Sequence, residues 1–146
     1  WPTKRLLTFS IIEGLIALFG FFSLDIIDGA GALFYNLPLP IIVGVTFLVF
    51  LVPTCAMGAT LPVLVTELTS RTGNVGASTG QLYYINTLGA AIGALAVAYV
   101  LLPWGGLDGA VRVAALINLA ISVTAALTLN RSVAAMLRAP APGAAS

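Results

Sequence analysis

The sequence predicts an all-α integral membrane protein, a four-helix bundle with a proline-broken second helix. Hydrophobic residues make up 60% of the 146 residues and charged residues only 8%, whereas about 25% of the residues in an average soluble domain are charged. Residues 29–66 and 72–107 contain no charged residue. Each gap is longer than the ~20 residues that a helix needs to cross a bilayer. Residues 47–52 also lack the polar alternation of a membrane β-strand.

Apolar density and turn signals place the four spans at residues 6–24, 39–66, 80–102 and 110–129, within a membrane domain of residues 1–131. The Ala- and Pro-rich end, residues 132–146, is expected to be a flexible tail. The chain begins with Trp rather than Met, which favours a piece of a longer polypeptide.

The basic residues predict the orientation of these spans. On the side of both termini and of the loop that joins spans two and three lie Lys4, Arg5, Arg71, Arg131 and Arg138. Only Arg112 falls on the opposite side. The positive-inside rule therefore puts both termini in the cytoplasm.

The first span contains a carboxylate, Glu13, about 10 Å from the cytoplasmic end of the span. A charge at that depth costs a few kcal/mol, so the group should be protonated, paired or turned into the bundle. Two interpretations stay open: a proton or cation site, and a protonated side chain that bonds a neighbouring helix.

The second span contains two prolines, Pro53 and Pro62, and each interrupts the helical hydrogen bonding. They free the carbonyl groups of Val49 and Gly58, which the hydroxyls of Thr54 and Thr60, a water or an ion could satisfy. Broken helices of this kind line cavities in transporters, but a simple kink that improves packing is the more common outcome.

The third span contains Gly89 and Gly93 in a GxxxG pattern, extended by Ala90 and Ala94. Small residues at this spacing let another helix approach closely. Asn86 projects from much the same face, so we expect it to point into a helix contact.

Depth counting brings polar groups of the four spans to one level in the inner leaflet. The predicted layer consists of Glu13, the freed carbonyl of Gly58, Thr60, Asn86 and, in the fourth span, Thr124. It is a candidate cation or proton site.

Composition argues against several other functions. A net charge of +1 provides no basic field for nucleic acid. The chain has no His and a single Cys, Cys55, so it lacks the common ligands of a metal centre or haem. We expect no catalytic residue, no metal and no cofactor.

Three segments resemble the membrane part of the bacterial spermidine synthase-like membrane proteins, also described as fused major-facilitator-type transporter and spermidine synthase. They are MGATLP at residues 57–62, GQLYYINTLGAAIGA at 80–94 and LLPWGGLDGA at 101–110. Glu13, in the segment IIEGLIALFG, resembles a Glu in the preceding helix of that family. The similarity covers roughly residues 6–129.

The resemblance implies a multi-pass protein of the bacterial inner membrane. The glycine-rich cofactor loop and the catalytic aspartates of the synthase domain in that family have no counterpart in this chain. The chain is therefore not expected to be an enzyme by itself. Two functions remain. The first is a helical module of a synthase-like or transporter-like protein, with a polyamine or other cation as a candidate ligand. The second is an accessory or scaffold subunit that packs through its Gly and Ala faces against other membrane helices.

Overall fold

The computed structural model describes residues 2–138, and the side chains of residues 4–131. The described part of the chain is helical and contains no strand. Its elements are α1 (Pro2–Phe34), α2 (Leu39–Thr72), α3 (Val75–Ala96), the short π-helix η1 (Val97–Leu101) and α4 (Leu102–Arg138). The expected all-α class is therefore confirmed for these residues.

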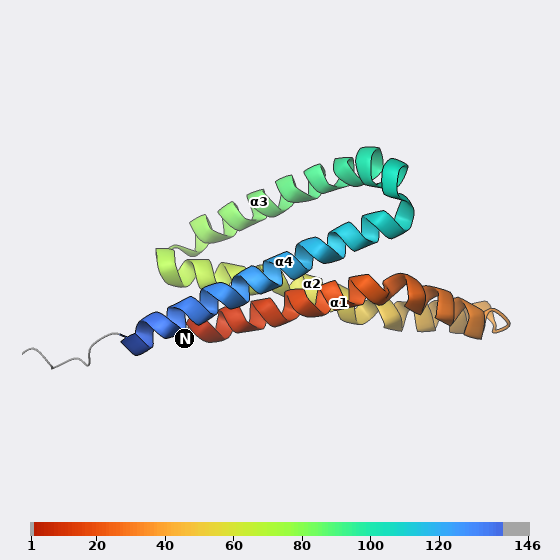
Figure 1. The fold of residues 1–146 in the computed structure, drawn as a ribbon, viewed down its shortest axis with the longest axis horizontal. Coiled ribbons are helices and arrows are strands. Elements are labelled where there is room, and N and C mark those ends of the chain that lie inside the picture. The colour runs from red at the N-terminus through yellow and green to blue at the C-terminus, as the bar shows by residue number, and fades with distance from the viewer. Residues whose placement is uncertain (1, 139–146) are drawn as a thin grey trace, which may run out of the picture.

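In the described part of the chain, three helical stretches are long and apolar enough to cross a membrane: Lys4–Phe34, Leu39–Thr72 and Val75–Arg131. The third contains a reversal of the chain at Gly106, whose φ of 62° and ψ of −168° are not helical. Figure 1 shows α3 and α4 as two arms that run in opposite directions on either side of this turn. The backbone geometry at Gly106 is one that essentially only glycine adopts.

Helix α1 lies at the centre of the packing. It contacts α4 most extensively and also contacts α2, whereas α3 contacts α2 and η1. Within the described residues, α2 does not contact α4, and α3 does not contact α1. Figure 1 agrees, since α3 stands apart from the other three helices along most of its length.

Small residues make the close approach of α1 and α4. A Cβ on Gly14 would lie 3.2 Å from the Oγ of Ser122, and a Cβ on Gly20 would lie 3.1 Å from the Cβ of Ala115. The hydroxyl of Ser10 donates to the carbonyl of Ser122 at 2.9 Å, and the hydroxyl of Ser122 donates to the carbonyl of Ser10 at 2.7 Å. Close backbones joined by reciprocal hydroxyl bonds are the usual means of association in lipid.

Helix α2 differs from the sequence prediction. It is one continuous helix from Leu39 to Thr72, with both Pro53 and Pro62 inside it, so the predicted break is not present. Each proline removes a single backbone donor, and the remaining hydrogen bonds of a 34-residue helix carry it through both positions.

Helices α1 and α4 are also longer than predicted, and α3 begins five residues earlier, at Val75, and ends at Ala96, where η1 follows. Helix α1 begins at Pro2 and continues past Asp25 and Asp28 to Phe34. Helix α4 continues to Arg138, so residues 132–138 of the predicted flexible tail are helical. The rest of that tail, residues 139–146, lies outside the described residues.

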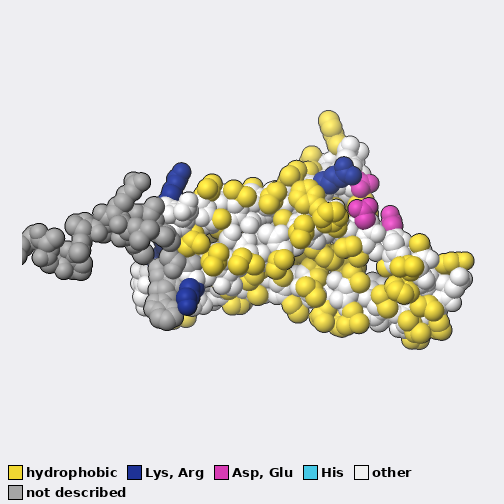
Figure 2. Space-filling model, turned by 60° about the horizontal axis from the view of Figure 1, so that its bottom comes forward, with side chains coloured by type: hydrophobic (Ala, Val, Ile, Leu, Met, Phe, Trp, Pro, Cys, Tyr) yellow, Lys and Arg dark blue, Asp and Glu magenta, His cyan; other side chains and the backbone are white. Residues whose placement is uncertain are grey.

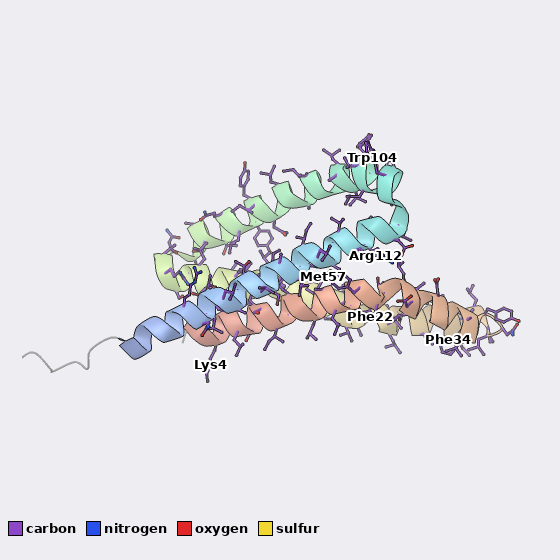
Figure 3. The ribbon with its side chains drawn as sticks, viewed as in Figure 1. Lys4, Phe22, Phe34, Met57, Trp104 and Arg112 are labelled. Atoms are coloured by element: carbon purple, nitrogen blue, oxygen red, sulfur yellow. The ribbon has the colours of Figure 1, made fainter. Side chains whose placement is uncertain are left out.

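The hairpin of α1 and α2 is longer than a bilayer core. The 33 residues of α1 correspond to about 50 Å, against ~30 Å of hydrocarbon. Figure 3 shows Phe34 at the tip of this hairpin, beyond Trp104 and Arg112 of the α3–α4 turn. The four helices are therefore unequal in length, and the first pair extends past the second.

Candidate functional site

The residues of the predicted polar layer lie in different environments. Glu13 is buried, Thr60 is half-buried, and Gly58, Asn86 and Thr124 are exposed. The Thr60 hydroxyl donates to the carbonyl of Met57 at 2.8 Å, a bond within its own helix. No described hydrogen bond joins any two of the five residues. The structure thus does not join them by hydrogen bonds, and their shared role stays a prediction.

Two further threonines of α2 and α4 also bond within their own helices. Thr124 donates to the carbonyl of Ala120 at 2.7 Å, and Thr66 donates to the carbonyl of Pro62 at 2.7 Å. Since Thr60 bonds Met57 rather than Gly58, the carbonyl group that Pro62 frees is not the one that this hydroxyl satisfies. The sequence predicts which helix contains each threonine, but it does not predict which backbone carbonyl accepts the hydrogen bond from the threonine hydroxyl.

Glu13 is the buried acid of the membrane-spanning part of α1, with 8% of its surface exposed. Among the described residues it has no hydrogen bond or ion pair. Its neighbours on the helix explain where it lies: Gly14 faces α4, and Phe19 stacks edge-on against Phe50 of α2 with ring centroids 6.0 Å apart. At 100° per residue, Glu13 lies between Ser10 and Gly20, both of which contact α4.

Among the described residues, no helix packs on the predicted packing residues of α3. Gly89, Ala90, Gly93 and Ala94 are all exposed. A Cβ added at Gly89 or at Gly93 would meet nothing within 4 Å. The close-packing face that the GxxxG pattern predicts is therefore open in the structure.

An ionic cluster at the N-terminal end of α1 was not predicted from the sequence. Glu67 of α2 is buried, and its Oε1 accepts a hydrogen bond from Nε of Arg71 at 2.8 Å and forms an ion pair with Nη2 of Arg71 at 2.8 Å. Arg5 of α1 lies 3.9 Å from the Oε2 of Glu67 and donates to the carbonyl of Thr66 at 3.2 Å. The cluster ties the start of α1 to the end of α2.

Part of this cluster could have been found in the sequence. Glu67 and Arg71 are four residues apart, which is the spacing of a helical ion pair. The contribution of Arg5 depends on the register between α1 and α2, and local spacing does not supply that register. The Oε2 of Glu67 and the Oγ1 of Thr69 are fully covered and accept no hydrogen bond in the described part of the chain.

Charged groups separate toward the two ends of the molecule. Figure 2 shows basic side chains near the N-terminal end, a hydrophobic middle, and acidic side chains with one basic group toward the other end. In that second group, Arg112 lies 3.8 Å from Asp108, and both are largely exposed. Figure 3 places Lys4 and Trp104 at opposite ends of the helices, in agreement with this division.

The hollows between the helices are apolar. One, of about 640 Å³, lies between α1 and α2 and is lined by Leu15, Ile16, Leu18, Phe19, Phe22, Asp25, Ile26, Val52, Pro53 and Ala56. A second, of about 280 Å³, lies nearer the tip of the same hairpin. Among the described residues, no three His, Cys, Asp or Glu side chains gather as a metal site.

Comparison with protein-family models, with curated proteins and with solved structures finds no match to this chain.

Proposed function

We propose that this chain is a membrane-embedded helical module, non-catalytic by itself, whose helix α3 packs against further transmembrane helices. One observation carries the proposal. Nearly every residue of α3 between Gly80 and Leu95 is exposed, although its small-residue face is of the kind that helices use to associate in lipid.

Asn86 strengthens this argument because of its chemistry. The carboxamide is exposed on α3 and lies three residues before Gly89, on nearly the same side of the helix. An amide in hydrocarbon without a hydrogen-bonding partner is costly. A helix that packs on the Gly89 and Gly93 face would both shield this amide and offer it a partner.

The proposal includes a topology of four membrane crossings, with both termini in the cytoplasm of a bacterial inner membrane. The reversal at Gly106 supports treating α3 and α4 as separate crossings. The five basic residues on the side of the termini, against Arg112 alone on the other side, support the orientation.

We further propose that the module is the membrane part of a spermidine synthase-like protein. This rests on the three sequence segments at residues 57–62, 80–94 and 101–110. In this form, the helices that cover α3 belong to the same polypeptide. In the alternative form, the chain is an accessory or scaffold subunit, and those helices belong to other subunits.

A cation path through the module is the less favoured role. It would require Glu13 to share a wet route with polar groups such as Asn86, yet Glu13 is buried and Asn86 is exposed on a helix that does not contact α1. Labelling a cysteine introduced at Asn86 or Thr60, in a Cys55→Ala background, separates the two roles. Ready reaction with a water-soluble maleimide favours a path, and protection favours packing.

The decisive experiment extracts the protein from native membranes in polymer-bounded lipid discs and weighs it before and after denaturation. We expect an assembly with helices beyond this chain. The substitution Gly93→Leu should break it, whereas Gly44→Leu, at another helical glycine with open space around it, should leave it intact. After denaturation, one polypeptide heavier than 15.0 kDa identifies the fused form, and a 15.0 kDa chain with separate companions identifies the subunit form. The proposal would be refuted if the chain is found without other helices and if Gly93→Leu leaves the assembly state unchanged.

A further inference from the structure

The apolar groove between α1 and α2 has an acidic group at one end. Its lining is apolar except for Asp25, which is exposed. Leu15, Leu18 and Phe22 form the outer rim and are each more than half exposed. Buried Pro53 belongs to the wall that α2 supplies. The groove therefore combines a long apolar surface with a single carboxylate.

The groove exists because the two helices present side chains of different size. Helix α1 contributes long or aromatic side chains, while α2 contributes the short Pro53 and Ala56. The volume of about 640 Å³ lies in the range of ~300–1,000 Å³ that is typical of small-molecule sites. This is enough space for an extended chain of methylene groups.

The position of the groove along α1 matches one leaflet of the bilayer. Arg5, which is bonded to the end of α2, marks one membrane surface. Leu15 is ten residues further along the helix, at ~15 Å, and Asp25 is twenty residues further, at ~30 Å. Since the hydrocarbon core is ~30 Å thick, the groove runs from the bilayer midplane to the far headgroup region, where Asp25 lies.

We propose that this groove binds one phospholipid that carries a primary ammonium headgroup, of the phosphatidylethanolamine type, in the leaflet on the side of the α1–α2 loop. An acyl chain lies along Leu15, Leu18 and Phe22, and the ammonium donates hydrogen bonds to Asp25. A primary ammonium has three donors and a quaternary ammonium has none, so the site distinguishes ethanolamine from choline headgroups of equal charge.

A transmembrane helix of another protein fits the groove less well. A helix would cross both leaflets, whereas the groove ends near the midplane at Leu15. The proposal also uses α1 and α2 rather than the face of α3, so either proposal can fail while the other stands.

The test uses the whole chain, purified in detergent and stripped of lipid, with dioleoylphosphatidylethanolamine and dioleoylphosphatidylcholine as probes. Native mass spectrometry counts the bound lipids. Because Asp25 is exposed, we expect a preference of about two- to fivefold for the ethanolamine lipid. Asp25→Asn should abolish the preference, and the matched control Asp28→Asn, one turn further on and outside the groove lining, should retain it.

A second variant tests the apolar part of the site. Ala56→Phe fills the groove and should weaken binding of both lipids, with helical content checked by circular dichroism. Equal binding of the two lipids by the unmodified chain would overturn the proposal. So would loss of the preference in both Asp variants, or unchanged binding in Ala56→Phe. A copurifying protein that Ala56→Phe displaces would also overturn it, in favour of a helix as the occupant.

Discussion

The contact between Gly20 and Ala115 gives a sharp test of how α1 and α4 associate. In Gly20→Ala, the new Cβ would lie 3.1 Å from the Cβ of Ala115, whereas carbon atoms prefer separations of about 3.5–4.0 Å. The two helices would have to separate by several tenths of an ångström along their closest contact. The hydrogen bonds between Ser10 and Ser122, further along the same interface, oppose that movement.

The expected magnitude follows from two opposing effects. Overpacking of this kind costs about 1–3 kcal/mol, while replacing a helical glycine by alanine returns up to about 1 kcal/mol. Gly44→Ala is the matched control, because a Cβ there meets nothing within 4 Å and only the second effect applies. The free energy of unfolding of Gly20→Ala should therefore be about 1–3 kcal/mol lower than that of Gly44→Ala.

Reversible unfolding in bicelles, followed by circular dichroism, measures these values. Ala115→Gly removes the opposing methyl group, so Gly20→Ala should cost less in that background. The double-mutant cycle should give a coupling of about 1–3 kcal/mol. Coupling below about 0.5 kcal/mol would mean that the two sites are independent, and the proposed contact between α1 and α4 would be refuted.

Three further predictions concern the turns and the ionic cluster. Gly106→Ala should destabilise the α3–α4 hairpin by about 1–3 kcal/mol, because φ is 62° there; a neutral effect in the same unfolding assay would contradict the reversal at this residue. Asn74→Ala should cost about 0.5–2 kcal/mol, since the Asn74 side chain accepts a bond from the N–H of Ala77 at 3.0 Å, and hydrogen exchange at the start of α3 should rise with it. Glu67→Gln removes the charge that holds Arg5 and should speed hydrogen exchange in the first turns of α1, with unchanged exchange counting against the cluster.

The sequence predicts the helical class because long stretches without charged residues can be recognised from the order of residues alone. It predicts the end of α2 less well, although Gly73 at a φ of 69° and Asn74 as the cap of α3 are typical turn residues. Helix α1 continues past Asp25 and Asp28 because charged residues do not stop a helix, and no proline follows until Pro38. Helix bounds taken from hydrophobicity alone are therefore too short.

The candidate site was harder to predict, because it depends on how each helix is rotated. Counting residues along each span places Glu13 and Asn86 at similar depths in the bilayer. Depth alone does not determine which faces of the helices contact each other. Glu13 lies on the side of α1 that contacts α4, whereas Asn86 lies on a helix that does not contact α1. The groove beside Asp25 likewise needs the register between α1 and α2, which neither helix encodes alone.

The number of membrane crossings is the central claim, and side-specific cysteine labelling tests it most directly. In a Cys55→Ala background, single cysteines replace Asn36, Gly73 and Gly105, one in each connection between helices. An impermeant maleimide is then applied to right-side-out and to inverted vesicles. We predict that positions 36 and 105 react from one side and position 73 from the other. Labelling of positions 73 and 105 from the same side would contradict it, since α3 would then fail to cross the membrane.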